Sequence, residues 1–186
     1  MMKAILAMVF WILATGSAMA QSDWDYGSWR VSTFSENVGT AGIVEDVYHY
    51  CIASSGGDGD PRISIEFMSH DAGPPTVYPS VVIEEYAPRG YDTQMQDGMT
   101  GYIIFDSYET AAATPITSYD PDGYKIARVS YDQPYSQWML QKMQANGRLD
   151  LVIQGRPVAA FQLNGFTAAY LKAADECGFS GVGVIP

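Results

Sequence analysis

The pattern of apolar and polar positions is clearest in the last third of the chain, from Gly147 to Gly178. Apolar residues there first recur at every second position, which is the period of a half-buried β-strand: Leu149, Leu151 and Ile153. A second strand pattern covers residues 158–163, and the pair Gly155-Arg156 between the two is a candidate two-residue turn. The pattern predicts a β-hairpin.

A helical pattern follows this hairpin directly. Asn164 interrupts the strand and is a residue type that caps helix N-termini. Gly178 stands where a helix end favours glycine. Between them, one apolar stripe recurs at the spacing of a helix that packs on a core: Phe166, Ala169, Tyr170, Ala173 and Cys177.

Strand patterns also dominate the rest of the chain. We expect strands over residues 29–34, 44–54, 62–69, 76–86, 101–106, 114–119 and 125–131. The strand over residues 62–69 alternates, with Ile63, Ile65 and Phe67 predicted to face inward and Arg62, Ser64 and Glu66 outward. Residues 23–29 form an aromatic-rich lead-in, residues 35–42 a polar loop, and residues 87–101 a longer loop. Pro79 predicts an irregular start or an edge position for its strand, and Asp120-Pro121-Asp122-Gly123 is typical of a tight turn.

A second helix is predicted between the last two groups of strands. Pro134 suits the first helical position, and the helix would end at Asn146 before Gly147. Its apolar residues Trp138, Met139 and Met143 would face the core.

Strand patterns therefore outnumber helical ones, and both helices belong to the C-terminal third. We expect an α+β fold that is mainly β, either an antiparallel β-sandwich or a rolled sheet, with two helices in that third. No internal repeat or shift in composition marks a second domain, so residues 21–186 are expected to form one β-rich domain.

The N-terminal residues have the pattern of an export signal. Lys3 precedes an apolar run from Ala4 to Ala14, and Ala18-Met19-Ala20 resembles a cleavage site. We interpret residues 1–20 as a signal peptide, which predicts a periplasmic or secreted protein. The alternative, a membrane anchor, would need about 20 apolar residues, which is more than the run from Ala4 to Ala14 provides. We expect no membrane span in the mature chain.

The charge of the chain restricts its partners. The 186 residues carry a formal net charge of −11, and removal of Lys3 with the signal peptide makes it −12. Such a chain repels phosphate backbones and anionic lipids, which argues against nucleic acid and membrane surfaces as partners. The acidic residues are scattered, as on a solvated surface.

The two cysteines, Cys51 and Cys177, are expected to form a disulfide, because an exported chain meets an oxidising compartment and an even count leaves no free thiol. The bridge would attach the C-terminal helix to a strand. A buried pair of free thiols and a metal site are the alternatives, although the cysteines and histidines lack closely spaced ligand pairs.

Residues that could transfer protons are few. His49 lies in a strand pattern near Cys51, and His70 precedes Asp71. Packed or surface histidines explain both positions. The neighbours Glu84-Glu85 should face opposite sides of their strand and so share no site.

Nucleophilic catalysis also finds little support. Ser54-Ser55-Gly56-Gly57 lacks the Gly-x-Ser-x-Gly spacing, and a disulfide would remove the thiol of Cys51. We expect no catalytic residues and no enzyme activity. An envelope hydrolase centred on His49 or His70 is the least favoured hypothesis.

Two turns carry closely spaced carboxylates that could bind calcium, Asp58-x-Asp60 and Asp120-x-Asp122-Gly123. Neither has a downstream glutamate of the EF-hand type, and both are typical of ordinary turns. We therefore expect no metal and no cofactor.

The 13 tyrosines suggest a different kind of site, an aromatic groove for a sugar or peptide, although β-rich cores use the same residues.

The C-terminal residues also resemble a known family. The stretch from Phe161 to Tyr170, FQLNGFTAAY, resembles the S-L-K-G-F-T-A-A signature of the invasion-associated locus B family of exported proteobacterial proteins. Gly155-Arg156-Pro157-Val158 is similar to that family's G-K-P-V hairpin. The chain lacks the family's mid-chain cysteines and adds Cys177. The resemblance implies a non-catalytic, β-rich envelope protein of a Gram-negative bacterium, and no catalytic residue carries over from it.

The sequence therefore predicts a non-catalytic exported accessory protein that contacts another envelope component or a host protein. The alternative function is a small-molecule or glycan binding protein that uses an aromatic groove, with calcium as a possible aid.

Overall fold

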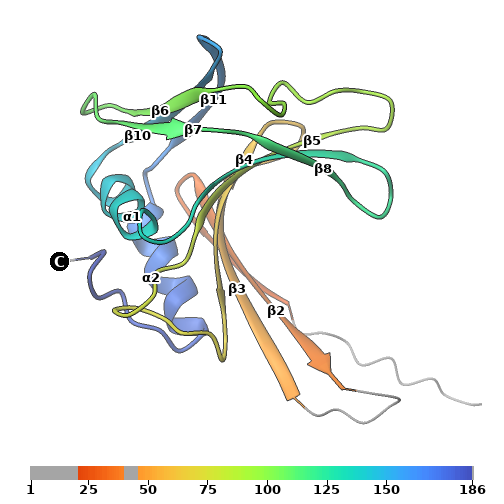
Figure 1. Ribbon diagram of the computed structural model, residues 1–186. Helices are drawn as coiled ribbons and strands as arrows, with labels where there is room; N and C mark the ends of the chain where they lie inside the picture. The colour runs from red at the N-terminus through yellow and green to blue at the C-terminus, as the bar shows by residue number, and fades with distance from the viewer. Residues whose placement is uncertain (1–20, 40–45, 186) are drawn as a thin grey trace, which may run out of the picture.

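The computed structural model describes residues 21–39 and 46–185, so the predicted signal peptide lies outside the described residues. The described chain forms the following strands and helices (Figure 1): β1 (Ser22–Tyr26), β2 (Trp29–Val38), β3 (Asp46–Gly56), β4 (Arg62–Met68), β5 (Val81–Ala87), β6 (Gly101–Phe105), β7 (Thr110–Ala113), β8 (Ile116–Tyr119), β9 (Lys125–Tyr131), α1 (Ser136–Ala145), β10 (Arg148–Ile153), β11 (Arg156–Gln162) and α2 (Phe166–Glu176).

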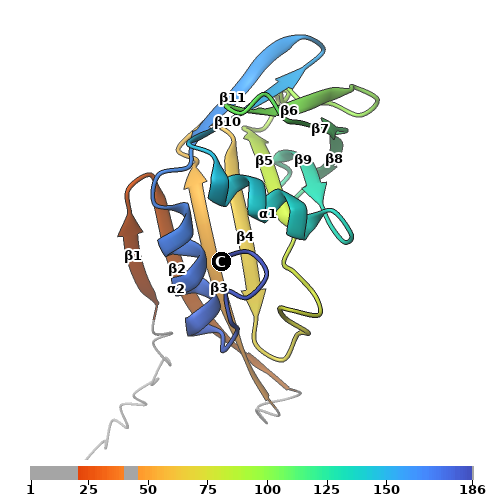
Figure 2. The same cartoon turned by 90° about the vertical axis from the view of Figure 1, so that its left-hand side faces the viewer.

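The strands form two antiparallel sheets. The larger has seven strands in the order β1-β2-β3-β4-β5-β9-β8, and the smaller has four in the order β11-β10-β6-β7. Both helices lie on one face of the larger sheet, as Figure 2 shows, and the smaller sheet lies at one end of it. The predicted fold class, a mainly β α+β fold with two helices in the C-terminal third, is confirmed.

The core fills the space between the helices, the smaller sheet and one face of the larger sheet. The alternating residues of β4 that the pattern placed inward, Ile63, Ile65 and Phe67, are at most 3% exposed. The apolar stripe of α2 is buried against β2 and β3, where Trp29 meets Phe166 edge-on with 5.1 Å between the ring centroids. We call this covered side the inner face and the opposite side of the larger sheet the outer face.

The C-terminal hairpin is confirmed, but its turn is Gln154-Gly155 rather than Gly155-Arg156. Gln154 and Gly155 have φ angles of 52° and 73°. Positive φ at both central residues is what a type I′ hairpin turn requires. Arg156 instead pairs with Ile153 as the first residue of β11.

The N-terminus of α2 also differs from the expectation. Gly165, with φ 92°, is the N-cap, and no side chain of the described residues caps the helix. Asn164 instead accepts a hydrogen bond from the Ser28 hydroxyl at 2.7 Å, because its side chain turns towards the β1–β2 turn. The predicted end of the helix is confirmed, since Gly178 has φ 77° and its N–H donates to the Asp175 carbonyl at 3.0 Å.

Helix α1 begins at Ser136, two residues after the predicted start. Pro134 belongs to the preceding turn, and Tyr135 is the N-cap. The core-facing assignment of Met139 and Met143 is confirmed, because both are fully buried. Trp138 is only partly buried.

Three strand assignments also needed correction. The aromatic lead-in forms β1, β2 continues to Val38 into the predicted loop, and the short strand β7 was not predicted because Thr110–Ala113 has no apolar alternation. Strand β5 begins only at Val81, so the irregular start expected from Pro79 is confirmed.

Cys51 and Cys177 lie at disulfide distance, with 2.03 Å between their sulfur atoms and 6.0 Å between their Cα atoms. Cys51 is on the inner face of β3, and Cys177 is the C-cap of α2. The bridge therefore attaches the end of α2 to the middle of the larger sheet.

Candidate functional site

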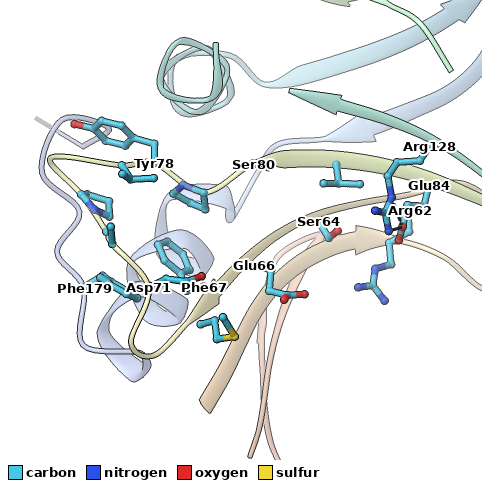
Figure 3. A pocket seen from close by; sticks show the side chains of 17 residues that line it. Arg62, Ser64, Glu66, Phe67, Asp71, Tyr78, Ser80, Glu84, Arg128 and Phe179 are labelled. Atoms are coloured by element: carbon cyan, nitrogen blue, oxygen red, sulfur yellow. Dashed lines mark hydrogen bonds and ion pairs between the residues drawn. The ribbon is translucent and has the colours of Figure 1, made fainter. Parts of the chain in front are cut away.

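A cleft of about 480 Å³ opens between β4, β5 and the loop of residues 71–80 (Figure 3). It exists because β4 and β5 stop pairing early. The two strands are paired over Arg62–Ile65 and Val81–Glu84, but β4 continues to Met68 while the loop departs from it. We call this space the outer cleft.

The end of β4 presents backbone groups to the outer cleft. Ser69 donates its N–H to the His49 carbonyl of β3 at 2.8 Å. In an antiparallel ladder, successive residues of a strand bond to opposite neighbours. Since Ser69 bonds to β3, the backbone groups of Glu66 and Met68 point to the other side of β4. The paired part of β5 ends before it reaches these two residues, so β5 supplies no partner for them. The Met68 carbonyl accepts the N–H of Asp71 at 3.2 Å. The cleft therefore contains a short stretch of open strand edge.

A row of charged residues crosses the other end of the cleft. Arg62, Glu84 and Arg128 are cross-strand partners on β4, β5 and β9. The Nε of Arg128 lies 2.9 Å from Oε1 of Glu84, and an Nη of the same guanidinium contacts the same oxygen. Glu84 is only 7% exposed. Three neighbouring strands thus hold these charges in fixed positions.

Arg62 contributes a donor that no described residue accepts. Its Nε is buried and has no hydrogen-bond partner among residues 21–39 and 46–185. A buried N–H without an acceptor costs about 1–3 kcal/mol. The Arg62 side chain as a whole is partly exposed and lines the cleft, so its guanidinium can turn to meet an acceptor on a bound partner and recover that cost.

Glu66 lies between this charged row and the loop (Figure 3). It is an exposed residue by surface area, yet the cleft walls desolvate its carboxyl and raise its pKa. The charge of Arg62 opposes this increase, and the charge of Glu84 adds to it. A positive charge on a bound partner would therefore lower the pKa of Glu66, as the charge of Arg62 does.

The loop end of the cleft is apolar and closely packed. Phe179 stacks on Phe67 with 5.7 Å between the ring centroids. A Cβ at Gly73 would lie 2.0 Å from the Phe179 ring, so the loop can pass this close only with glycine. Tyr78 is buried and accepts a hydrogen bond from the Gln137 side-chain amide at 3.1 Å. The cleft thus combines a charged end with an apolar wall.

The histidines lie elsewhere. Nδ1 of His49 lies 2.7 Å from the Ser35 hydroxyl, and Nε2 of His70 lies 4.0 Å from a carboxylate oxygen of Asp46. Asp71 lines the outer cleft, whereas neither histidine does. The structure therefore does not assemble the conceivable His70–Asp71 pair at the cleft.

The expectation that Glu84 and Glu85 share no site is confirmed. Glu84 faces the outer cleft, whereas Glu85 points to the inner side and accepts the N–H groups of Gln94 and Met95 at 2.7 and 3.0 Å. Glu85 thereby anchors the long loop after β5.

One of the two carboxylate turns, Asp120-x-Asp122-Gly123, has a structural role in the described chain. Asp120 accepts the N–H of Tyr124 at 2.8 Å and closes the β8–β9 turn. Within the residues that the structure describes, no three His, Cys, Asp or Glu side chains are grouped closely enough to hold a metal ion.

The exposed aromatic residues are spread over many elements. Tyr91, Tyr108, Tyr119 and Tyr135 are each at least 67% exposed and belong to different parts of the chain. On the outer face Phe34 and Tyr50 stack with 4.8 Å between the ring centroids.

Sequence reasoning did not identify Arg62, Glu66 or Arg128 as site residues, although alternation had placed Arg62 and Glu66 on the outward side of β4.

Comparison with known proteins finds no relative of this chain. No protein-family model, no curated protein and no solved structure matches the chain. Within the described ranges, no helix has the length and apolar character needed to cross a bilayer.

Proposed function

We propose that this protein is a non-catalytic, exported accessory protein that binds a protein of the cell envelope or of a host surface through the outer cleft. The observation that carries the proposal is the cleft's fixed pattern of charge, with Arg62 unpartnered beside the Glu84–Arg128 pair. Charges that are already positioned give orientation and specificity to a protein contact.

The cleft indicates the chemistry of the bound segment. A carboxylate or carbonyl on the partner would accept from Arg62, and a basic side chain would lie against Glu66 and Asp71. The partner's backbone would pair with the open edge of β4 at the backbone groups of Glu66 and the N–H of Met68, since the Met68 carbonyl already accepts from Asp71. Such a contact uses binding groups alone, since the Glu84 carboxylate is occupied by Arg128 and no histidine lines the cleft.

The test is capture of partners by the tagged chain from cross-linked envelopes of its own source, followed by mass spectrometry. Substitution of Arg62 by Met and of Glu66 by Lys should each reduce capture of a specific partner about tenfold. Arg148→Ala is the matched control, because Arg148 is an exposed arginine paired with Asp150 on the smaller sheet. Equal capture by all three variants would refute binding at the outer cleft.

A further inference from the structure

A second groove, of about 730 Å³, lies between the smaller sheet, the end of β9 and the start of α1. Both Figure 1 and Figure 2 show β7, which borders it, beside β8. The groove is more apolar than the outer cleft, and aromatic rings form much of its wall. Its lining includes Ala111, Ala112, Val129, Tyr131, Tyr135 and Trp138.

Strand β7 is an edge strand with one open side. It pairs with β6, and none of the described strands pairs with its other side. Phe105 of β6 donates its N–H to the Glu109 carbonyl at 2.9 Å, so residues 109, 111 and 113 direct their backbone groups to β6. Thr110 and Ala112 therefore direct theirs to the open edge. The Tyr131 hydroxyl donates to the Ala112 carbonyl at 2.8 Å, which places that carbonyl on the groove side.

The sequence of β7 leaves this edge unprotected. Edge strands usually carry lysine, proline or a bulge that prevents another strand from pairing with them. The residues Thr110–Ala113, TAAA, have none of these, and their small side chains allow another backbone to approach closely. An extended peptide beside β7 would pair with both backbone groups of Thr110 and with the N–H of Ala112, whose carbonyl already accepts from Tyr131. Its alternate side chains would point towards Tyr131 and Trp138.

The charge around the groove selects among such peptides. Asp132 is the charged residue in the lining, and it accepts the Ser130 hydroxyl at 2.8 Å while remaining exposed. Lys142 lies over the Trp138 ring but is paired with Glu109 at 2.5 Å. With a net charge of −11 for the whole chain, the surroundings favour a basic segment.

We propose that β7 binds an extended segment of a partner protein by strand addition, with apolar side chains at alternate positions and a basic residue beside Asp132. This site is separate from the outer cleft, and none of the residues that line one cavity lines the other. Failure of either proposal would therefore leave the other standing.

The experiment uses the chain that begins at Gln21 and the synthetic peptide acetyl-Lys-Val-Thr-Val-Thr-Val-Lys-amide. Titration followed by Trp fluorescence and by amide NMR should give saturable binding, with protection of the Thr110 and Ala112 amides from hydrogen exchange. The same peptide with N-methyl groups on alternate amides cannot form the backbone ladder and should bind at least about tenfold more weakly. No saturable binding, or equal binding of the two peptides, would overturn the proposal.

Two variants locate the binding. Ala112→Pro removes an edge N–H without disturbing the bonds to β6, and it should weaken binding about tenfold. Its matched control is Ala160→Pro on β11, the opposite edge of the same sheet. Ala160 also directs its N–H outward, because the Leu163 N–H donates to the Gly147 carbonyl at 2.9 Å and alternation then turns the backbone groups of residues 160 and 162 away from β10.

Tyr135→Ser provides a change outside the strand. Tyr135 is 67% exposed at the start of α1, where serine is a good N-cap, so the variant should fold and bind the peptide more weakly. Binding that fell equally in the Ala112→Pro and Ala160→Pro variants would show non-specific edge pairing and would also refute the assignment to β7.

Discussion

The carboxyl of Glu66 shows how the outer cleft changes the chemistry of one side chain. Its raised pKa means that the folded chain holds this proton more tightly than the unfolded chain does. Ionisation of Glu66 is thus less favourable in the folded chain than in the unfolded chain. The stability that comes from the neutral form is present below the ordinary value of 4.5 and is lost as the pH rises through the raised pKa.

The variant Glu66→Gln should therefore be more stable than the parent chain at pH 7, and the difference should disappear below about pH 4.5, where both side chains are neutral. Urea denaturation midpoints at a series of pH values measure this. Glu109→Gln is a control of opposite sign, because the hydrogen bond from Lys142 lowers the pKa of Glu109. That variant should be less stable at pH 7, and its deficit should vanish as the pH falls. A Glu66 variant that lost stability at pH 7 would contradict the argument.

Among the elements, the junction between β11 and α2 depends on a single residue. Gly165 has φ 92°, and a Cβ there would lie 1.8 Å from the Tyr26 carbonyl oxygen. The β1–β2 turn packs against this point, where Ser28 donates its N–H to the Asn164 carbonyl at 3.1 Å. The helix start is consequently fixed by contact with the first hairpin, not by a capping side chain.

The variant Gly165→Ala should lose about 3 kcal/mol or more, since the clash with backbone adds to the cost of a positive φ. Gly155→Ala is the matched control. Gly155 has φ 73° but open space around it, so alanine there should cost only about 1–2 kcal/mol. Equal losses in chemical denaturation would show that φ alone, and not the contact with Tyr26, sets the requirement at Gly165.

At the scale of the whole molecule, the disulfide joins two parts of the chain that are 126 residues apart. It attaches α2, which covers β2 and β3, to the centre of the larger sheet. Replacement of Cys51 and Cys177 by Ala should lower the free energy of unfolding by about 5 kcal/mol, because a loop of this length gains much freedom in the unfolded chain.

Urea denaturation of the double variant and of the parent chain, each with and without reductant, measures this loss. Reductant should destabilise the parent chain and leave the double variant unchanged. Alkylation of the denatured parent chain without reductant provides the direct control. Incorporation of two labels would show that the bridge does not form.

The proposed binding roles also belong to this scale, because each site is assembled from distant segments. The outer cleft combines three strands of the larger sheet with the loop of residues 71–80, and the β7 groove combines both sheets with α1. The resemblance of the C-terminal stretch to the invasion-associated locus B family stays a prediction, as do the signal peptide and export.

The sequence by itself determined the elements whose burial repeats with a regular period. The alternation of Ile63, Ile65 and Phe67 and the helical stripe from Phe166 to Cys177 are local patterns, and the structure confirms both. It also indicated the cysteine pair, because the chain offers only two. It missed β7, whose small residues carry no alternation.

Only the tertiary structure decided which residues meet across strands. Arg62, Glu84 and Arg128 are far apart in the chain, and their row depends on the register of three strands, which no local pattern encodes. Likewise, Gly165 replaces Asn164 at the start of α2 because Tyr26 lies against it. Local periodicity fixes which face of an element is buried, whereas strand register and close packing fix what each exposed side chain can bind.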